Sequence, residues 1–237
     1  MYLDHLEQLI STKKWWRLRV YIRFHKQAIL EQARYSKMLH SQTNLLQILC
    51  RFDPPLGAIE AIHSLYPENV FELDHERNSA LHIACSKGCN YEVIKYLMEL
   101  NPFIVDKANY RNRYPFLLIF KNYHERKNEK EDTADNDLLK IAKLLHDVAP
   151  LSSIQEDFRG KTALDYAIQN EIGLAPIKYL QKLFSDVRRD IKISEKYMEI
   201  QREQLSLEEF GKKKQYVFPE YFHGAVMVHN KNKAPAA

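Results

Sequence analysis

The chain has 237 residues, a mass of 28.1 kDa, a formal net charge of +4 and a mean hydropathy of -0.48. These values are typical of a soluble protein with one elongated domain or two small ones, and 6 glycines beside 9 prolines disfavour a parallel α/β enzyme with phosphate-binding loops. The longest apolar run, Phe116–Phe120, is far shorter than the roughly 18 residues of a membrane span, and residues 1–7 lack the pattern of a secretory signal.

Residues 1–40 are predicted to form a basic helical cap. They carry 8 Lys/Arg against 3 Asp/Glu, and apolar residues recur in them at helical spacing. Residues 15–24 alternate apolar and polar positions as a strand would, yet Trp16, Val20 and Phe24 also lie at i, i+4 and i+8. We favour a helix, because no second strand is evident to pair with this one. The cations in this stretch, with no acidic residue among them, form either a solvated face or a docking site for an anionic partner.

Residues 41–184 contain a repeat whose helix starts recur at offsets of 36, 35 and 48 residues. These starts are at Thr43, Ser79, Tyr114 and Thr162. A polar turn precedes the last three, and an apolar helical stretch ending in proline follows the first three. Because one such helix pair cannot bury its own apolar face, the repeat predicts a stack of pairs.

The residues of this repeat resemble the ankyrin signature D-x-x-G-x-T-P-L-H-x-A. Asp74 followed by Ser79-Ala80-Leu81-His82-Ile83-Ala84 is similar to it, and so is the segment from Asp157 to Leu164. The resemblance covers about four repeats, of which the third is degenerate, and Arg77 stands where a turn glycine is usual, so we expect a less regular turn there. The resemblance implies an all-α fold, an ankyrin-type helix-turn-helix solenoid with an N-terminal helical cap and a long charged C-terminal helix.

Three segments outside the regular repeat carry their own predictions. The third repeat is 13 residues longer than its neighbours, and the excess near residues 123–135 is so polar that we expect a solvated loop, with an acidic contact loop as the alternative. Residues 185–210 are predicted to be a charged helix that covers the last repeat, although a coiled coil is also compatible. Residues 211–237 form a basic and aromatic tail, either a docking peptide or a segment that folds back on the array.

No residue pattern supports catalysis or cofactor binding. His82, Cys85 and Cys89 would share one side of a continuous helix, but Gly88 is expected to end that helix and no fourth zinc ligand has suitable spacing. The better interpretation is structural: Cys85 and Cys50 occupy equivalent small buried positions too far apart for a disulfide, and His82 bonds the backbone between adjacent turns. We therefore predict no enzyme activity, no cofactor, no metal site and no small-molecule substrate. Three cysteines fit a reducing compartment, so we expect an intracellular protein, cytoplasmic or nuclear.

In the ankyrin family the partner usually lies along the concave face, which is made of turn tips and the ends of the first helices. Carried onto this sequence, that resemblance gives a candidate partner-binding set that is rich in cations and aromatic residues: Arg51, Phe52, Lys87, Tyr110, Arg111, Arg113, Lys121, Phe158, Arg159 and Lys161. The expected function is a protein–protein interaction module that binds a partner with an acidic segment. The alternatives are a structural subunit of a larger assembly, docked through its basic ends and aromatic tail, and an RNA-associated protein.

Overall fold

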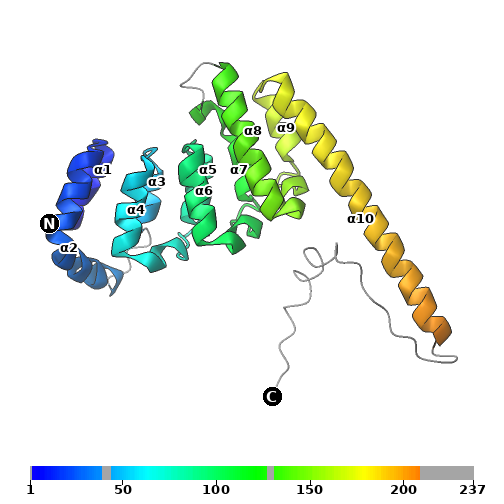
Figure 1. Cartoon of the computed structure of the whole chain (residues 1–237), viewed down its shortest axis with the longest axis horizontal. Helices are drawn as coiled ribbons and strands as arrows, with labels where there is room; N and C mark the ends of the chain where they lie inside the picture. Colours follow the sequence, from blue (N-terminus) through cyan, green and yellow to red (C-terminus); the bar gives the residue numbers. More distant parts are fainter. Residues whose placement is uncertain (1, 39–43, 127–130, 209–237) are drawn as a thin grey trace. The chain divides into compact units, whose positions relative to one another are not determined.

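Helices are the regular elements throughout the part of the chain that the structure describes. The computed structural model describes residues 2–38, 44–126 and 131–208, and within them it contains no strand (Figure 1). The all-α prediction is therefore confirmed. The chain divides into two compact units, residues 1–189 and 190–237. The predicted tail at residues 211–237 lies outside the described residues.

The first unit is built from helix pairs, each made of a first helix, a turn and a second helix. The first helices are α1 (Tyr2–Ser11), α3 (Leu45–Cys50), α5 (Ala80–Ser86), α7 (Pro115–Lys121) and α9 (Ala163–Gln169). The second helices are α2 (Trp15–Met38), α4 (Leu56–Leu65), α6 (Tyr91–Leu100), α8 (Glu131–Val148) and α10 (Leu174–Glu208). Short 3-10 helices follow three of the second helices, namely η1 (Pro67–Val70), η2 (Pro102–Asp106) and η4 (Pro150–Ile154). A further one, η3 (Tyr123–Arg126), follows α7.

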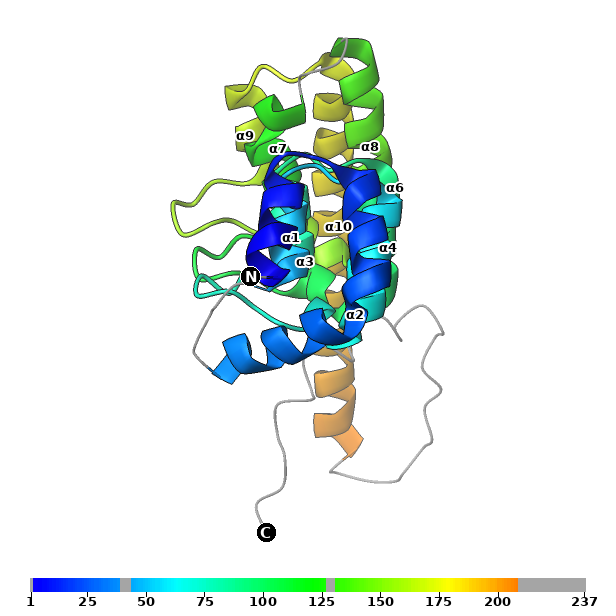
Figure 2. The ribbon, with the colours of Figure 1, turned by 90° about the vertical axis from the view of Figure 1, so that its left-hand side faces the viewer.

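The pairs stack in two layers. In one layer each first helix contacts the next, from α1 through α3, α5 and α7 to α9; in the other, α2 contacts α4, α4 contacts α6 and α6 contacts α8. Figure 2 shows the two layers side by side, with the long turns projecting beside the first-helix layer. This is the helical solenoid that the repeat predicts.

Apolar helix faces explain the stacking. In α6 the buried side chains are Val93, Ile94, Leu97 and Met98, one stripe at helical spacing. Helix α7 is buried along residues 115–120, because α5 and α9 of its own layer lie on either side of it. Side chains also cap the free N–H groups at the starts of α3, α5, α6 and α9, so local sequence and packing favour the same helix boundaries.

The N-terminal cap is itself a helix pair of the stack. After α1 the chain turns through Lys13, whose φ of 52° is left-handed, and left-handed residues likewise follow three other first helices, at Asp53, Gly88 and Glu171. The segment at residues 15–24 is helical, as we favoured, and forms the first part of α2. The cap lacks the signature turn, so the sequence repeat does not reveal its kinship to the later pairs.

The described parts of the inserted segment of the third repeat are helical. Residues 123–126 form η3, while residues 131–135 are the first turns of α8, so the loop prediction is wrong for that part. The second helix of this pair has 18 residues, against 10 in both α4 and α6. Ala134 is 5% exposed, which places the added helical turn against the core.

The boundary predicted at residues 184 and 185 lies inside α10, a continuous helix of 35 residues. Its first part belongs to the last pair, and Leu180, Leu183 and Val187 are buried there. In the second unit, α10 runs on to Glu208 with Ile193 and Met198 exposed, and the coiled coil stays a prediction. Across the described ranges no helix is long and apolar enough to cross a membrane.

Candidate protein-interaction surface

The three long turns are built alike. Each is closed by a side-chain oxygen that accepts two backbone N–H groups, and these oxygens belong to Asp74, Asn109 and Asp157. The fourth residue of each turn is left-handed: Arg77 has a φ of 61°, Asn112 of 52° and Gly160 of 69°. The expectation of a less regular turn at Arg77 is wrong, because the arginine adopts the backbone conformation that glycine adopts in the fourth repeat.

Backbone hydrogen bonds tie neighbouring turns into a row. The N–H of Tyr110 donates to the carbonyl of Glu76 at 3.0 Å, and the N–H of Phe158 donates to the carbonyl of Arg111 at 3.1 Å. The side-chain amide of Asn109 also donates to Oδ1 of Asn78 at 2.8 Å. The turns therefore hold fixed positions relative to one another, beside the first-helix layer (Figure 2).

Aromatic rings and guanidinium groups alternate on the exposed side of this row. Tyr110 is 71% exposed with the guanidinium of Arg77 at 5.7 Å from its ring centre, and Phe158 is 62% exposed with that of Arg159 at 5.5 Å. Nη2 of Arg111 lies 2.8 Å from Oε1 of Glu76 on the preceding turn. We call the surface formed by Arg77, Tyr110, Arg111, Phe158 and Arg159 the tip face.

Residues 76–109 match the family model of the ankyrin repeat. These residues are an ankyrin repeat. The match runs from the tip of one turn to the start of the next and contains α5 and α6. The resemblance stated from the sequence is thereby confirmed for these residues, and the turns at Asn109 and Asp157 repeat the hydrogen bonds of the turn at Asp74. No curated protein matches the chain.

Arg113 does not belong to the ankyrin tip face, although the sequence placed it there. Its side chain is 10% exposed, and its Nε lies 3.4 Å from Oδ2 of Asp157. Oδ2 of Asp157 also accepts a hydrogen bond from the hydroxyl of Tyr166 at 2.8 Å. The prediction of Arg113 as a contact residue is wrong, because the side chain joins the third turn to the fourth instead of facing solvent.

Two lysines of the predicted set gather over Tyr166 at the end of the ankyrin array. The ammonium groups of Lys121 and Lys161 lie 5.1 and 5.5 Å from its ring centre. Burial lowers the pKa of Lys121 below its ordinary value, and the positive charge of nearby Arg113 lowers that pKa further. The positive charges of Lys121, Lys161 and Arg113 are therefore concentrated around this ring.

The remaining predicted residues lie at the ends of the earlier first helices. Lys87 follows α5 and its ammonium group lies 3.3 Å from Oε1 of Glu125. Arg51, exposed, and Phe52, half-buried, follow α3, one repeat before the tip face. Arg77 was not among the contact residues predicted from the sequence. Its position in the turn could have indicated it, but there it was interpreted as the loss of a turn glycine and not as an added positive charge.

His82 and the three cysteines have structural positions in the ankyrin stack. The His82 ring accepts at Nδ1 from the backbone N–H of Ser79, while Nε2 bonds the carbonyl of Lys107 at 3.0 Å, as the sequence predicted. Cys50, Cys85 and Cys89 are buried and not joined by disulfides, and Sγ of Cys89 donates to the carbonyl of Cys50 at 3.3 Å. Within residues 2–38, 44–126 and 131–208, no group of three or more His, Cys, Asp or Glu side chains could hold a metal ion.

Proposed function

We propose that this chain is a non-enzymatic interaction module that binds an acidic segment of a partner protein at the tip face. The observation that carries the proposal is the pair of exposed rings, Tyr110 and Phe158, each with an arginine guanidinium against its face. Ankyrin repeats typically act as protein-binding modules, but a fold by itself does not fix a function.

The chemistry of the tip face supports an acidic partner. Tyrosine and arginine are the residue types that most often dominate binding energy at protein interfaces. Asp74 and Asp157 are buried, and their carboxylates are bound within the protein, that of Asp157 also by Arg113 and Tyr166, so neither faces an incoming partner. Glu76, which holds Arg111, is the acidic side chain that an incoming carboxylate would displace.

The rigidity of the row supports an extended or helical segment as the bound form. Successive turns are fixed by backbone hydrogen bonds, so the rings of Tyr110 and Phe158 are presented in a constant register. A preorganised surface loses little conformational freedom on binding. A linear segment with acidic residues between apolar anchors would meet rings and guanidinium groups in alternation.

The test uses a displayed library of random peptides selected on the full chain. We expect selection to enrich peptides with several Asp or Glu residues, and we expect Arg111→Glu/Arg159→Glu to weaken their binding about tenfold or more. The matched control is Lys95→Glu/Lys143→Glu, which reverses the same number of charges on α6 and α8, in the second-helix layer. Circular dichroism confirms that each variant keeps its helix content.

A substitution that removes a negative charge from the tip face should strengthen binding of the same peptides. Glu76→Gln removes the carboxylate that holds Arg111, so the enriched peptides should bind this variant more tightly than the wild type. Selection without acidic enrichment, or equal affinity of the charge-reversed variant and its control, would show that the tip face is not the binding site.

A further inference from the structure

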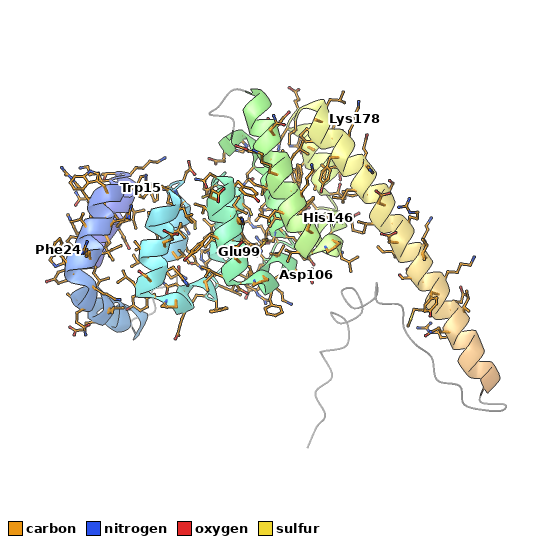
Figure 3. The ribbon with its side chains drawn as sticks, viewed as in Figure 1. Trp15, Phe24, Glu99, Asp106, His146 and Lys178 are labelled. Atoms are coloured by element: carbon orange, nitrogen blue, oxygen red, sulfur yellow. The ribbon has the colours of Figure 1, made fainter. Side chains whose placement is uncertain are left out.

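The outer face of helix α2 carries an unpartnered aromatic stripe. Before the kink at His25, the buried side chains Leu18 and Ile22 face the stack. On the other side of the same helix, Trp16 is 67% exposed, Val20 45% and Phe24 76%. Figure 3 shows Phe24 at the outer edge of the first helix pair. We call Trp16, Val20 and Phe24 the cap face.

Polar side chains could occupy the solvent-facing positions of this helix, yet in the cap face these positions are apolar. Its three apolar side chains are one helical turn apart, so they form a continuous strip. Contiguous exposed apolar surface marks sites of association more often than chance. No other described segment of the chain covers these three side chains, which stay open to solvent.

Cations flank the strip on both sides. The exposed cations of this region are Lys13, Lys14, Arg17, Arg19, Arg23 and Lys26, and residues 8–30 contain no Asp or Glu. The guanidinium of Arg17 lies 5.3 Å from the ring centre of Trp16. On the other flank, the guanidinium of Arg19 packs against Gly57 of α4, where an added Cβ would lie 3.3 Å from it. The charged residues beside the apolar strip are all cations. A matching partner must therefore offer negative charge together with an apolar region.

We propose that the cap face docks the chain on an anionic lipid membrane surface. A bilayer interface offers both phases at once: aromatic and aliphatic side chains enter the acyl boundary, while arginine and lysine reach the headgroups. The strip stands on the convex side of a single helix, and a planar interface accepts such a surface without needing a complementary groove. Juxtamembrane basic clusters bind acidic lipids in the same way.

The charges disfavour a second copy of the chain as the occupant. Two cap faces in contact would oppose six cations with six cations. At the other end of the stack, α10 exposes Lys178, Lys182 and Arg188, while Arg189 pairs with Asp186, so end-to-end association would also bring an excess of like charge together. Nucleic acid offers no apolar region in which Val20 could be buried. Proteins that bind single strands hold the nucleic-acid backbone along a groove, whereas the cap face is one side of a single helix.

The experiment measures binding of the full chain to vesicles of phosphatidylcholine, with and without phosphatidylserine. We expect sedimentation with the phosphatidylserine vesicles alone, and weakening of binding as salt rises. Tryptophan emission should shift to the blue and be quenched by brominated lipids, because Trp16, one of the two tryptophans of the chain, lies in this face.

Two variants test the apolar and the electrostatic contributions to vesicle binding separately. Trp16→Ser/Phe24→Ser removes the apolar strip, and Arg17→Gln/Arg23→Gln removes flanking charge; each should weaken vesicle binding about tenfold or more. The control is Phe71→Ser/Phe103→Ser, which removes rings that are 64% and 81% exposed elsewhere, and it should bind as the wild type does. The tip-face variant Arg111→Glu/Arg159→Glu should also retain vesicle binding, so this proposal and the proposed function fail independently.

Three results would overturn the proposal. One is absence of binding to phosphatidylserine vesicles at low salt. Another is a Trp16→Ser/Phe24→Ser variant that binds vesicles as tightly as the Phe71→Ser/Phe103→Ser control. The third is binding of polyglutamate or an RNA oligonucleotide that the same variants abolish while vesicles do not bind, which would assign the cap face to an acidic protein or to RNA.

Discussion

Arg113 and Asp157 form a buried ion pair that joins the turns of the third and fourth repeats, with Nε and Oδ2 3.4 Å apart. The Asp157 side chain is fully buried and that of Arg113 is 10% exposed. The third repeat departs most from the family signature and carries the insertion. This charged contact therefore links the third repeat to the fourth in addition to the backbone hydrogen bond from Phe158 to Arg111.

Asp157 should make the stability of the chain depend on acid. Burial raises its pKa, but hydrogen bonds from Tyr166, from the backbone of Arg159 and Lys161, and from Arg113 together hold the pKa below its ordinary value. Because the folded pKa is lower than the unfolded value of about 3.9, this contribution is complete above that pH and is lost as the pH falls through the folded pKa. Urea denaturation from pH 6 downward should show a shallower acid loss in Asp157→Asn than in the exposed control Asp137→Asn.

Reversing Arg113 should unfold the chain more readily than reversing the exposed arginines. Arg113→Glu places a second carboxylate beside buried Asp157, and disrupting a buried pair typically costs about 3–5 kcal/mol. Arg111→Glu and Arg159→Glu act at exposed sites and should change the free energy of unfolding by less than about 1 kcal/mol. Chemical denaturation followed by circular dichroism compares the three variants. Equal stability of all three would show that the Arg113–Asp157 pair contributes nothing.

His82 gives a second pH dependence, in a different window. Burial lowers its pKa to about 4, against the opposing influence of the Lys107 and Arg113 backbones and of Asp74. Between about pH 6.5 and pH 4, His82 is protonated in the unfolded chain but neutral in the folded chain. The free energy of unfolding therefore falls as the pH is lowered through this window, by about 3 kcal/mol in total.

The chain supplies its own control for His82. The N-cap of α3 is Asn44 and not the predicted Thr43, so Gln47 is the third residue of α3, the place that His82 has in α5. Nε2 of Gln47 donates to the carbonyl of Glu72 at 3.0 Å, just as His82 bonds Lys107. His82→Gln should therefore keep nearly the wild-type stability at pH 7 and lose part of the decline between pH 6.5 and pH 4. Parallel pH profiles for the two chains would contradict the assignment.

Much of the fold followed from the sequence, because repeated turns and helix caps are local. The spacing of Asp74, Asn109 and Asp157 predicted three turns, and the structure builds all three with the same hydrogen bonds. What the sequence could not give was the environment of each side chain. Arg113 and Arg111 are neighbours in one turn, yet one is buried and the other exposed, because only Arg113 points toward the next repeat.

The insertion and the cap illustrate two further limits of sequence analysis. A polar composition near residues 123–135 indicated a loop, but the anchored Ala134 allowed α8 to extend into it. The spacing of Trp16, Val20 and Phe24 predicted a helix correctly while leaving open which face packs. That choice depends on the neighbouring helices α1 and α4, which no local pattern identifies.

A side chain at Gly173 should destabilise the chain, because the residue before α10 lies against Asp135 at the start of α8. A Cβ added at Gly173 would collide with Oδ2 of Asp135, whose Oδ1 accepts a hydrogen bond from the hydroxyl of Tyr123 at 2.6 Å. Gly173→Ala should therefore cost about 1–3 kcal/mol, since the carboxylate must move and its hydrogen bond is lost. Asp135→Ala relieves the collision, so the double variant should be more stable than the two single losses predict. Additive losses in this double-mutant cycle would show that the two positions do not touch.

A substitution at Arg77 should change the stability of the chain and its affinity for a partner in opposite directions. Its φ of 61° is left-handed, a conformation that costs a residue with a side chain about 1–2 kcal/mol more than glycine, while glycine loses about 0.5–1 kcal/mol of that advantage through its freer unfolded chain. Arg77→Gly should thus raise the free energy of unfolding by about 0.5–1 kcal/mol, whereas Gly160→Ala, at the equivalent place in the fourth repeat, should lower it. The same substitution removes the guanidinium beside Tyr110, so acidic peptides that bind the tip face should bind this variant more weakly. A variant that is both more stable and weaker in binding would indicate that arginine is kept at a glycine position for its contact with the partner; a more stable variant with unchanged affinity would remove Arg77 from the tip face.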